Sequence, residues 1–382
     1  MPPSFELTEE ERLIQQTARD FANDRIVPIA AENDRQGRFS KKVLKEMADL
    51  GFMSMLIPEE YGGVGLGNFS LALVLEEINR ACASTGVTMS VHNSLASSPI
   101  IRYGSDETKK KFLPRMATGE LLGAYALSEA GAGSDAASLQ CRATKDGDHY
   151  VFNGTKSWVT TGAEAGIFVV MVRTNPGERS KGISSFVVER DTPGFSIGKK
   201  ENKLGLRASS TVQLVFEDAR VPARQILGKE GEGFKIAMET LDGGRIGIAA
   251  QAVGIAKASL DASVAYANER EQFGKKIARF QAIQWKLADM ATSIDAARLL
   301  MYRAARLRDA GEPHTQEAAM AKLFASEMSN RAAREAVQIH GGAGYLKEFP
   351  VERYYRDARI TEIYEGTSEV HRIVISRNLT KN

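Results

Sequence analysis

Hydrophobic residues in the first third of the chain recur with the period of an α-helix. From Thr8 to about Ala117 they are spaced by three and four positions, as on the buried face of an amphipathic helix. One such face carries Ile14, Ala18, Phe21 and Ala22. Proline and glycine at Pro58, Gly62 and Gly63 interrupt the pattern. We therefore expect an N-terminal helical domain with loops, spanning residues 1–120.

The pattern changes to a period of two in the middle of the chain. Short β-rich runs occupy residues 167–172 and 183–188. Apolar residues alternate with their neighbours at Val212, Leu214 and Phe216. Turn dipeptides stand at Asp146-Gly147 and Asn153-Gly154, and the second predicts a hairpin. Because no long helical stretch separates the strands, residues 121–228 are expected to form an antiparallel sheet or small barrel.

Long helical patterns return after Gly231. One apolar stripe consists of Val253, Ala256, Leu260, Val264 and Ala267. A longer one consists of Ile283, Leu287, Met290, Ile294, Ala297, Met301 and Ala304. Gly311 and Pro313 close the second stripe, as expected at a helix end. Residues 229–382 thus form a second helical domain, and the fold class is a multi-domain α+β protein.

Composition excludes several functions. Fifty basic and 48 acidic residues give a net charge of +2, so neither nucleic acid nor an anionic membrane is an expected partner. The two cysteines, Cys82 and Cys141, cannot form a disulfide framework, and the five histidines lack metal-ligand spacing. No apolar run approaches the roughly 20 residues of a membrane span, and the first residues resemble no signal or transit peptide. We expect a cytoplasmic protein without a bound metal.

The glycine-rich segment 127–135, L-S-E-A-G-A-G-S-D, has two interpretations. A Rossmann fingerprint is unfavourable because strands rather than a helix follow it. It is either an inter-domain loop or a backbone nest, in which Gly131 and Gly133 allow close approach of a phosphate or flavin ring. Trp158 likewise either packs in the core or covers a planar cofactor, with Thr160 on the same strand face.

Three further segments also leave alternatives open. Arg270 either compensates a helix dipole or binds a pyrophosphate, and residues 338–344 either cap a helix or serve the same anion. Glu365 stands between an aromatic residue and a glycine. It is either a surface glutamate or a carboxylate against an apolar wall, where desolvation would make it a competent general base.

Taken in order along the chain, these segments resemble the acyl-CoA dehydrogenase family. The resemblance rests on Y-A-L-S-E-A-G-A-G-S-D, S-W-V-T-T-G, L-D-G-G-R-I, R-E-Q-F-G-K, Q-I-H-G-G-A-G-Y and R-D-A-R-I-T-E-I-Y-E-G-T-S-E. The third and the last two are most similar to the short-chain (butyryl-CoA) branch. The resemblance covers essentially the whole chain. It implies an N-terminal α-helical domain, a middle antiparallel β-domain and a C-terminal four-helix bundle, with FAD bound between them and a homotetramer built as a dimer of dimers.

The resemblance also implies the roles of individual residues. Positions matching contacts to the isoalloxazine and ribityl parts of FAD are Tyr125, Leu127, Ser128, Gly133, Ser134, Trp158 and Thr160. Positions matching contacts to the adenine and pyrophosphate, largely across a subunit interface, are Arg270, Phe273, Gln281, Gln338, Gly341 and Gly342. Thr367 and Glu369 match further FAD contacts. Positions matching contacts to the acyl-CoA are Ser134, Ser180, Asp242, Arg245 and Gly366.

Glu365 matches the catalytic base of the family. Some branches, such as the isovaleryl type, carry the base at the position matching Gly244 instead, and here that position is empty. The implied reaction is α,β-dehydrogenation of a short-chain acyl-CoA: Glu365 takes the α-proton, hydride passes to flavin N5, and electrons leave to electron-transfer flavoprotein. The alternatives are an acyl-CoA oxidase using O₂, a dehydrogenase of branched short acyl-CoAs, a non-redox CoA-thioester-binding module, and an all-helical scaffold protein.

Overall fold

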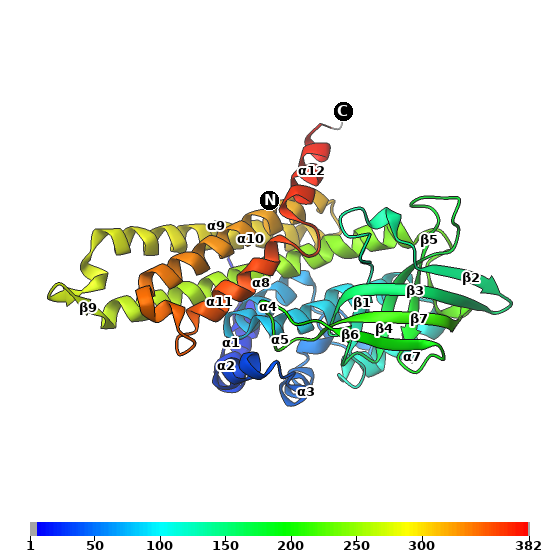
Figure 1. Cartoon of the computed structure of the whole chain (residues 1–382), viewed down its shortest axis with the longest axis horizontal. Helices are drawn as coiled ribbons and strands as arrows, with labels where there is room; N and C mark the ends of the chain where they lie inside the picture. Colours follow the sequence, from blue (N-terminus) through cyan, green and yellow to red (C-terminus); the bar gives the residue numbers. More distant parts are fainter. Residues whose placement is uncertain (1–5, 381–382) are drawn as a thin grey trace.

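The computed structural model describes residues 6–380 and shows a β-sheet domain held against two packed groups of helices (Figure 1). The N-terminal helices are α1 (Glu9–Phe21), α2 (Val27–Gln36), α3 (Lys41–Asp49), α4 (Asn68–Ala81), α5 (Ala83–Ser90), α6 (Ser98–Tyr103) and α7 (Asp106–Ala117). A capping box begins α1: Thr8 accepts a hydrogen bond from the Glu11 N–H, and the Glu11 carboxylate accepts one from the Thr8 N–H. The predicted N-terminal helical domain is confirmed.

The middle of the chain forms one eight-stranded sheet. Its strands are β1 (Gly123–Ala126), β2 (Arg142–Asp146), β3 (His149–Thr160), β4 (Ile167–Arg173), β5 (Ile183–Glu189), β6 (Phe195–Lys200), β7 (Thr211–Pro222) and β8 (Ile226–Leu227). Their order is β6-β7-β3-β2-β4-β5-β8, with β1 paired to β4. Most pairs are antiparallel as expected, but β1 runs parallel to β4 and β2 meets β4 in parallel at one residue pair. The long connection through β2 and β3 makes the parallel β1–β4 pair possible.

The hairpin predicted at Asn153-Gly154 is wrong. The turn between β2 and β3 consists of Gly147, with φ +61°, and Asp148, whereas Asn153 and Gly154 lie inside β3. Gly154 stands at a β-bulge with φ +140°, and a Cβ there would lie 2.8 Å from the Cys141 Cα. The glycine therefore allows close approach of a neighbouring segment rather than reversal of the chain.

Three long helices dominate the rest of the chain. They are α8 (Gly233–Glu269), α9 (Gln281–Asp309) and α10 (Thr315–His340), with the hairpin of β9 (Glu271–Gln272) and β10 (Lys275–Lys276) between the first two. The shorter α11 (Val351–Ala358) completes a four-helix bundle by packing on α8 and α10, and α12 (Ser368–Leu379) follows it. The stripe from Met290 to Ala304 is buried as predicted. Val264, in contrast, is 40% exposed.

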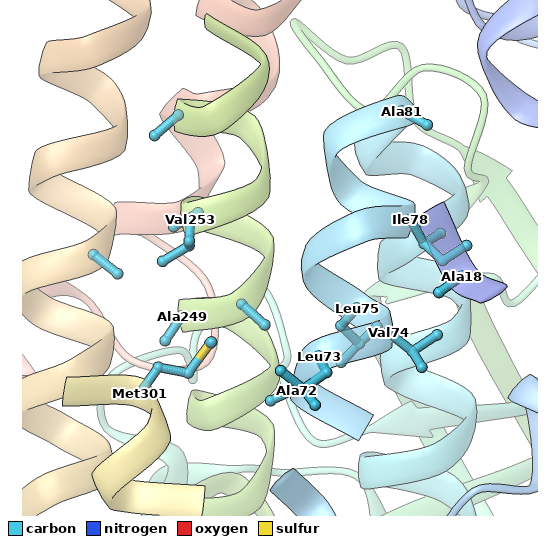
Figure 2. Packing of buried hydrophobic residues seen from close by; sticks show 14 of the residues in the cluster. Ala18, Ala72, Leu73, Val74, Leu75, Ile78, Ala81, Ala249, Val253 and Met301 are labelled. Carbon is cyan, nitrogen blue, oxygen red and sulfur yellow. The ribbon is translucent and has the colours of Figure 1, made fainter. Parts of the chain in front are cut away.

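The two helical groups share one core. Figure 2 shows α8, with Ala249 and Val253, between Met301 of α9 and the α4 residues 72–75. Small side chains on α8 let these helices approach closely. No helix in residues 6–380 combines the length and apolar character needed to cross a membrane. The helices that share this core carry part of the site described below, and the sheet and its loops carry the rest.

Candidate active site

Glu365 lies in a short turn that leads into α12. The turn begins after the 3₁₀ helix Arg359–Glu362 and ends at Thr367, whose hydroxyl accepts a hydrogen bond from the Val370 N–H. Two consecutive residues of the turn are left-handed, Glu365 with φ +53° and Gly366 with φ +102°. Only glycine adopts this conformation readily, so the surroundings must hold Glu365 in place. Its amide N–H forms no hydrogen bond within residues 6–380.

The Glu365 carboxylate points at α8. A Cβ placed on Gly244 would lie 2.0 Å from Glu365 Oε2 and 2.7 Å from a methyl carbon of Leu95. Oε2 is buried and has no hydrogen-bond partner. Burial raises the pKa of Glu365 to about 7, although the positive charges of Lys322 and Arg245 act in the opposite direction. A carboxyl group of this pKa is suited to accept a proton near neutral pH.

Two buried cations lie near this carboxylate. Arg245 of α8 forms an ion pair with Asp242 at 2.6 Å, and Asp242 also accepts a hydrogen bond from Thr315. The Arg245 Nε is buried without a partner. Lys322 of α10 is fully buried, and its Nζ donates a 2.6 Å hydrogen bond to the Gly366 carbonyl. The structure thus brings Glu365, Gly366, Asp242 and Arg245 of the predicted set together.

Tyr125 connects this cluster to the sheet. It lies on β1, packs against two hydrophobic clusters, and its hydroxyl is buried without a hydrogen-bond partner. Burial, with a smaller contribution from the Glu365 charge, raises the pKa of the Tyr125 hydroxyl. An unpaired buried hydroxyl costs free energy unless a further group satisfies it, so this atom is a candidate ligand contact.

The glycine-rich loop leaves β1 from a rigid base. Lys156 is fully buried, and its Nζ donates to the Leu127 carbonyl at 3.1 Å and to Glu129 Oε1 at 2.8 Å. The Glu129 carboxylate also accepts the N–H groups of Gln140 and Cys141. At the loop tip, by contrast, Cβ atoms on Gly131 and Gly133 would meet nothing within 4 Å. The loop is therefore fixed at its base and open at its tip.

Trp158 lies beside this loop. The Ser157 N–H donates a 2.9 Å hydrogen bond to the Ser128 carbonyl, which holds the two segments together. Trp158 itself has φ +57° at a β-bulge, and 54% of it is exposed. Of the two interpretations, core packing is wrong for this residue. Thr160 is half-buried. The β-bulge at Trp158 interrupts the regular alternation of side chains along β3, so the alternation alone does not place Trp158 and Thr160 on one face of the strand.

Ser134 and Ser180 lie on neighbouring loops. Arg179 donates to both carboxylate oxygens of Asp135 at 3.0 Å, so the residues next to the two serines are linked. Ser134 is exposed and Ser180 is half-buried. Neither serine side chain has a hydrogen-bond partner among residues 6–380, so both are available to a ligand.

A second set of predicted residues lies elsewhere. Figure 1 shows the β9 hairpin at the opposite end of the long axis from the sheet. The exposed residues around this end of the bundle are Arg270, Phe273, Gln281, Gln338, Gly341 and Gly342. Tyr266 of α8 stacks on His340 of α10 at 4.2 Å and joins the helix ends that carry them. One chain therefore does not bring this set to Glu365. Thr367 and Glu369, in contrast, lie next to Glu365 at the start of α12.

The residues present suit a planar, phosphate-bearing cofactor. Exposed Trp158 offers a flat apolar face, the open glycine loop offers backbone N–H groups, and Tyr125 offers an unsatisfied hydroxyl. None of the described residues 6–380 forms a cluster of three or more His, Cys, Asp or Glu side chains that would hold a metal ion.

Sequence reasoning missed Lys322 and the Lys156–Glu129 pair. A signal for Lys322 existed, because it stands four residues after Ala318 and three before Ala325, on the buried stripe of α10. A lysine on such a stripe needs a buried partner. The partner of Lys156 lies on another segment, Glu129, and the sequence offers no pattern that pairs them.

Comparison with known proteins adds independent information. Three family models match the chain, described as the N-terminal, middle and C-terminal domains of acyl-CoA dehydrogenase, over residues 8–120, 124–219 and 231–380. The mitochondrial short-chain specific acyl-CoA dehydrogenase of Mus musculus is 52% identical over 379 residues, which are 99% of this chain and 92% of the relative.

Solved structures agree. Butyryl-CoA dehydrogenase from Megasphaera elsdenii superimposes with a TM-score of 0.97 at 44% identity, covering 99% of this chain and 100% of the other. A chain in a structure described as electron transferring flavoprotein of Acidaminococcus fermentans superimposes with a TM-score of 0.98 at 48% identity, covering 100% of both chains.

Proposed function

Because this chain belongs to the acyl-CoA dehydrogenase family, we propose that it oxidises a saturated short-chain acyl-CoA to the trans-2-enoyl-CoA, with Glu365 as the acceptor of the α-proton. The observation that carries this assignment is the buried, unpartnered Oε2 of a carboxyl group whose pKa is raised to about 7. A general base works best when its pKa lies near the pH at which the enzyme operates, and a pKa of about 7 meets this condition near neutral pH. The protein is an oxidoreductase, and FAD is its cofactor.

The residues around Glu365 supply the other parts of the step. The α-proton is a weak acid, so the thioester oxygen must be stabilised as negative charge develops on it. The free amide N–H of Glu365 is our candidate donor. The acyl-CoA is held by Ser134, Ser180, Asp242, Arg245 and Gly366 in this proposal. The chemistry that FAD would supply when bound is acceptance of the β-hydrogen as hydride.

We assign the FAD contacts to two regions. The loop and strand residues Tyr125, Leu127, Ser128, Gly133, Ser134, Trp158 and Thr160, with Thr367 and Glu369, would hold the ring system and ribityl chain. The residues around Arg270, at the end of the bundle that carries the β9 hairpin, would hold the adenine and pyrophosphate of the FAD that a neighbouring subunit binds. Exposed apolar side chains at Phe273, Trp285 and Tyr345 support burial of this surface in a homotetramer.

The proposed substrate class has a direct test. Purified protein should be yellow with about one FAD per chain, as one FAD site per chain implies. Its kcat/KM should be highest with butyryl-CoA in a panel of straight acyl-CoAs from C4 to C16 with isobutyryl- and 2-methylbutyryl-CoA. Leu95, which lies against the Gly244 position beside the Glu365 carboxylate, is our candidate for the apolar wall that limits the length of the acyl chain. A colourless protein that takes up no added FAD, or a maximum at a long chain, would contradict the proposal.

Electron-transfer flavoprotein is the proposed electron acceptor. The match to a chain in a structure described by that name supports it. The alternative, direct use of O₂, predicts stoichiometric hydrogen peroxide during turnover with butyryl-CoA in air. We propose the cytoplasm as the location, because both Cys82 and Cys141 are buried free thiols that suit a reducing compartment.

Replacing Arg270 by alanine should weaken FAD retention and the oligomer together. Arg270 is exposed and takes part in no ion pair among the described residues, so its guanidinium is available to a pyrophosphate. A charge-assisted hydrogen bond of about 1.5–3 kcal/mol corresponds to a loss of affinity of about tenfold to 150-fold. Flavin content after dialysis and the mass in solution should both fall. Arg279→Ala, a nearby exposed arginine, is the control, and unchanged flavin content in Arg270→Ala would refute the role.

A further inference from the structure

Lys322 reaches the turn of Glu365 from the buried side of α10. Its side chain is completely buried, and its Nζ donates a 2.6 Å hydrogen bond to the carbonyl of Gly366, the residue after Glu365. Within the described residues it forms no salt bridge with a carboxylate. A lysine in such a position is costly, because burial penalises its charge. The cost suggests that the ammonium group has a task at this turn.

The first task is mechanical. Glu365 and Gly366 are both left-handed, a conformation that a glutamate avoids unless neighbouring contacts impose it. Tyr364 hydrogen-bonds to Gln251 of α8 on one side of the turn, and Thr367 caps α12 on the other. Lys322 holds the carbonyl between these two anchors. Without it, the central peptide of the turn would have no side-chain anchor.

The second task is electrostatic. The titratable groups facing Glu365 come from every element around it: Lys322 on α10, Arg245 on α8, Tyr125 on β1, Tyr364 in the turn and His371 on α12. Burial lowers the pKa of His371 to about 3 and raises those of the two tyrosines, so these three are neutral near pH 7. The two cations therefore decide the charge at Glu365.

Those two cations differ in their partners. Arg245 is already paired with Asp242 at 2.6 Å, so part of its charge is neutralised. Lys322 donates to an uncharged carbonyl, and the charge of Glu365 is the largest of the attractive influences on it, ahead of Glu362 and Glu369. Burial lowers the pKa of Lys322 to about 7, whereas the charge of Glu365 acts to raise it, so each of the two groups stabilises the charged form of the other.

We propose that Lys322 is a positioning residue for the proton-transfer step, holding the Gly366 carbonyl so that the Glu365 carboxylate faces the substrate and keeping that carboxylate ionised by its charge. The inference rests on the proposed function, in which Glu365 is the base. It assigns no bond making or breaking to Lys322 itself.

Three variants separate the two tasks. Lys322→Met removes both the charge and the hydrogen bond at similar volume, Lys322→Gln removes the charge but keeps a donor, and Lys322→Arg keeps both. A positive charge stabilises the ionised form of Glu365 and lowers its pKa, so removing it raises that pKa. The acid limb of kcat against pH should therefore move up by about one pH unit in the Met and Gln variants and stay in place in the Arg variant.

The plateau rate reports the mechanical task. Above the acid limb, Lys322→Met should reduce its flavin with butyryl-CoA about 10-fold to 100-fold more slowly than wild type, because the base is displaced, with KM little changed. Lys322→Gln should lose less. The rate at which the substrate α-hydrogens exchange in D₂O should rank wild type, Lys322→Gln and Lys322→Met in the same order. Its acid limb should shift in the same variants as the acid limb of kcat. This second readout follows proton transfer without requiring electron transfer to an acceptor.

Arg298→Met is the matched control for lost stability. Arg298 is a mostly buried cation of α9 that pairs with Glu76, away from the Glu365 turn. Its variant should lower the melting temperature and leave the acid limb unmoved. Should Lys322→Met fail to fold, Lys322→Gln still tests the charge.

The outcomes are distinct. Acid limbs of the Met and Gln variants within about 0.3 pH unit of wild type would overturn the role of Lys322. That result with an inactive Glu365→Gln variant would leave the proposed function standing. An active Glu365→Gln variant would instead show that another group removes the α-proton, and Lys322 would then have no base to position.

Discussion

Replacement of Glu365 by glutamine should abolish most turnover while leaving both ligands bound. Glutamine keeps the size and hydrogen-bonding reach of the side chain, but it cannot accept the α-proton. A positioned general base contributes about 10²–10⁴ in rate, so anaerobic flavin reduction by butyryl-CoA should slow by at least this factor. The Kd for butyryl-CoA and the FAD content should change little. Stopped-flow absorbance measures the rate, and titration in the absence of turnover measures the Kd.

The control is Glu327→Gln on α10. Glu327 is a more exposed carboxylate paired with Arg372 at 2.6 Å, and such pairs have small energetic effects. Its variant should reduce flavin within about threefold of wild type. If Glu365→Gln does the same, another group removes the α-proton and the proposed mechanism is wrong.

The fold could be predicted from the sequence where a helix or strand buries one face in a hydrophobic core, because the spacing of its apolar residues then shows the type of element. The stripe ending at Met301 and Ala304 is buried because α9 packs on α8, α10 and α4, which is what a repeat of three and four residues predicts. The hairpin at Asn153-Gly154 was wrong because the same dipeptide also serves a β-bulge. What decides between them is the approach of Cys141, a contact that local sequence does not reveal.

The candidate site was predictable in its residue types and only partly in its geometry. Glu365 was ambiguous in isolation, since burial alone distinguishes a base from a surface carboxylate. The neighbours that bury it include Gly244 of α8 and Lys322 of α10, both more than 40 residues away in the chain. The place of Lys322 on the buried stripe of α10 could have been read from the sequence, but its partner could not, because that partner is the backbone carbonyl of Gly366. The residues around Arg270 remain a prediction, since one chain leaves them exposed and distant from Glu365.

Gly244 of α8 is a second position from which a side chain could reach the space that the Glu365 carboxylate occupies. A Cβ on Gly244 would fall 2.0 Å from the present position of Glu365 Oε2, so side chains from the two positions compete for one space. Gly244→Glu alone should therefore be destabilised and almost inactive, because two carboxylates and Leu95 would be crowded together.

Combining Gly244→Glu with Glu365→Gly should restore activity. Glycine at 365 suits the left-handed φ of +53°, so the Glu365→Gly single variant should fold and bind FAD but turn over at least about 10²-fold more slowly than wild type. In the double variant, the carboxylate of the new glutamate at position 244 occupies the space freed at position 365. It starts from α8, a long helix that is buried along much of its length. Flavin reduction by butyryl-CoA should be about 10-fold to 100-fold faster than in Glu365→Gly and slower than in wild type, since the new carboxylate starts from a different backbone position.

The matched control is Gly244→Gln with Glu365→Gly, which has the same shape but no base and should stay as slow as Glu365→Gly. The new side chain also presses on Leu95, 2.7 Å from its Cβ position, so the preferred acyl chain should change along with the rate. A double variant no faster than its glutamine control would show that a carboxylate on α8 cannot reach the α-proton in this chain, and that Glu365 owes its role to the turn as well as to its charge.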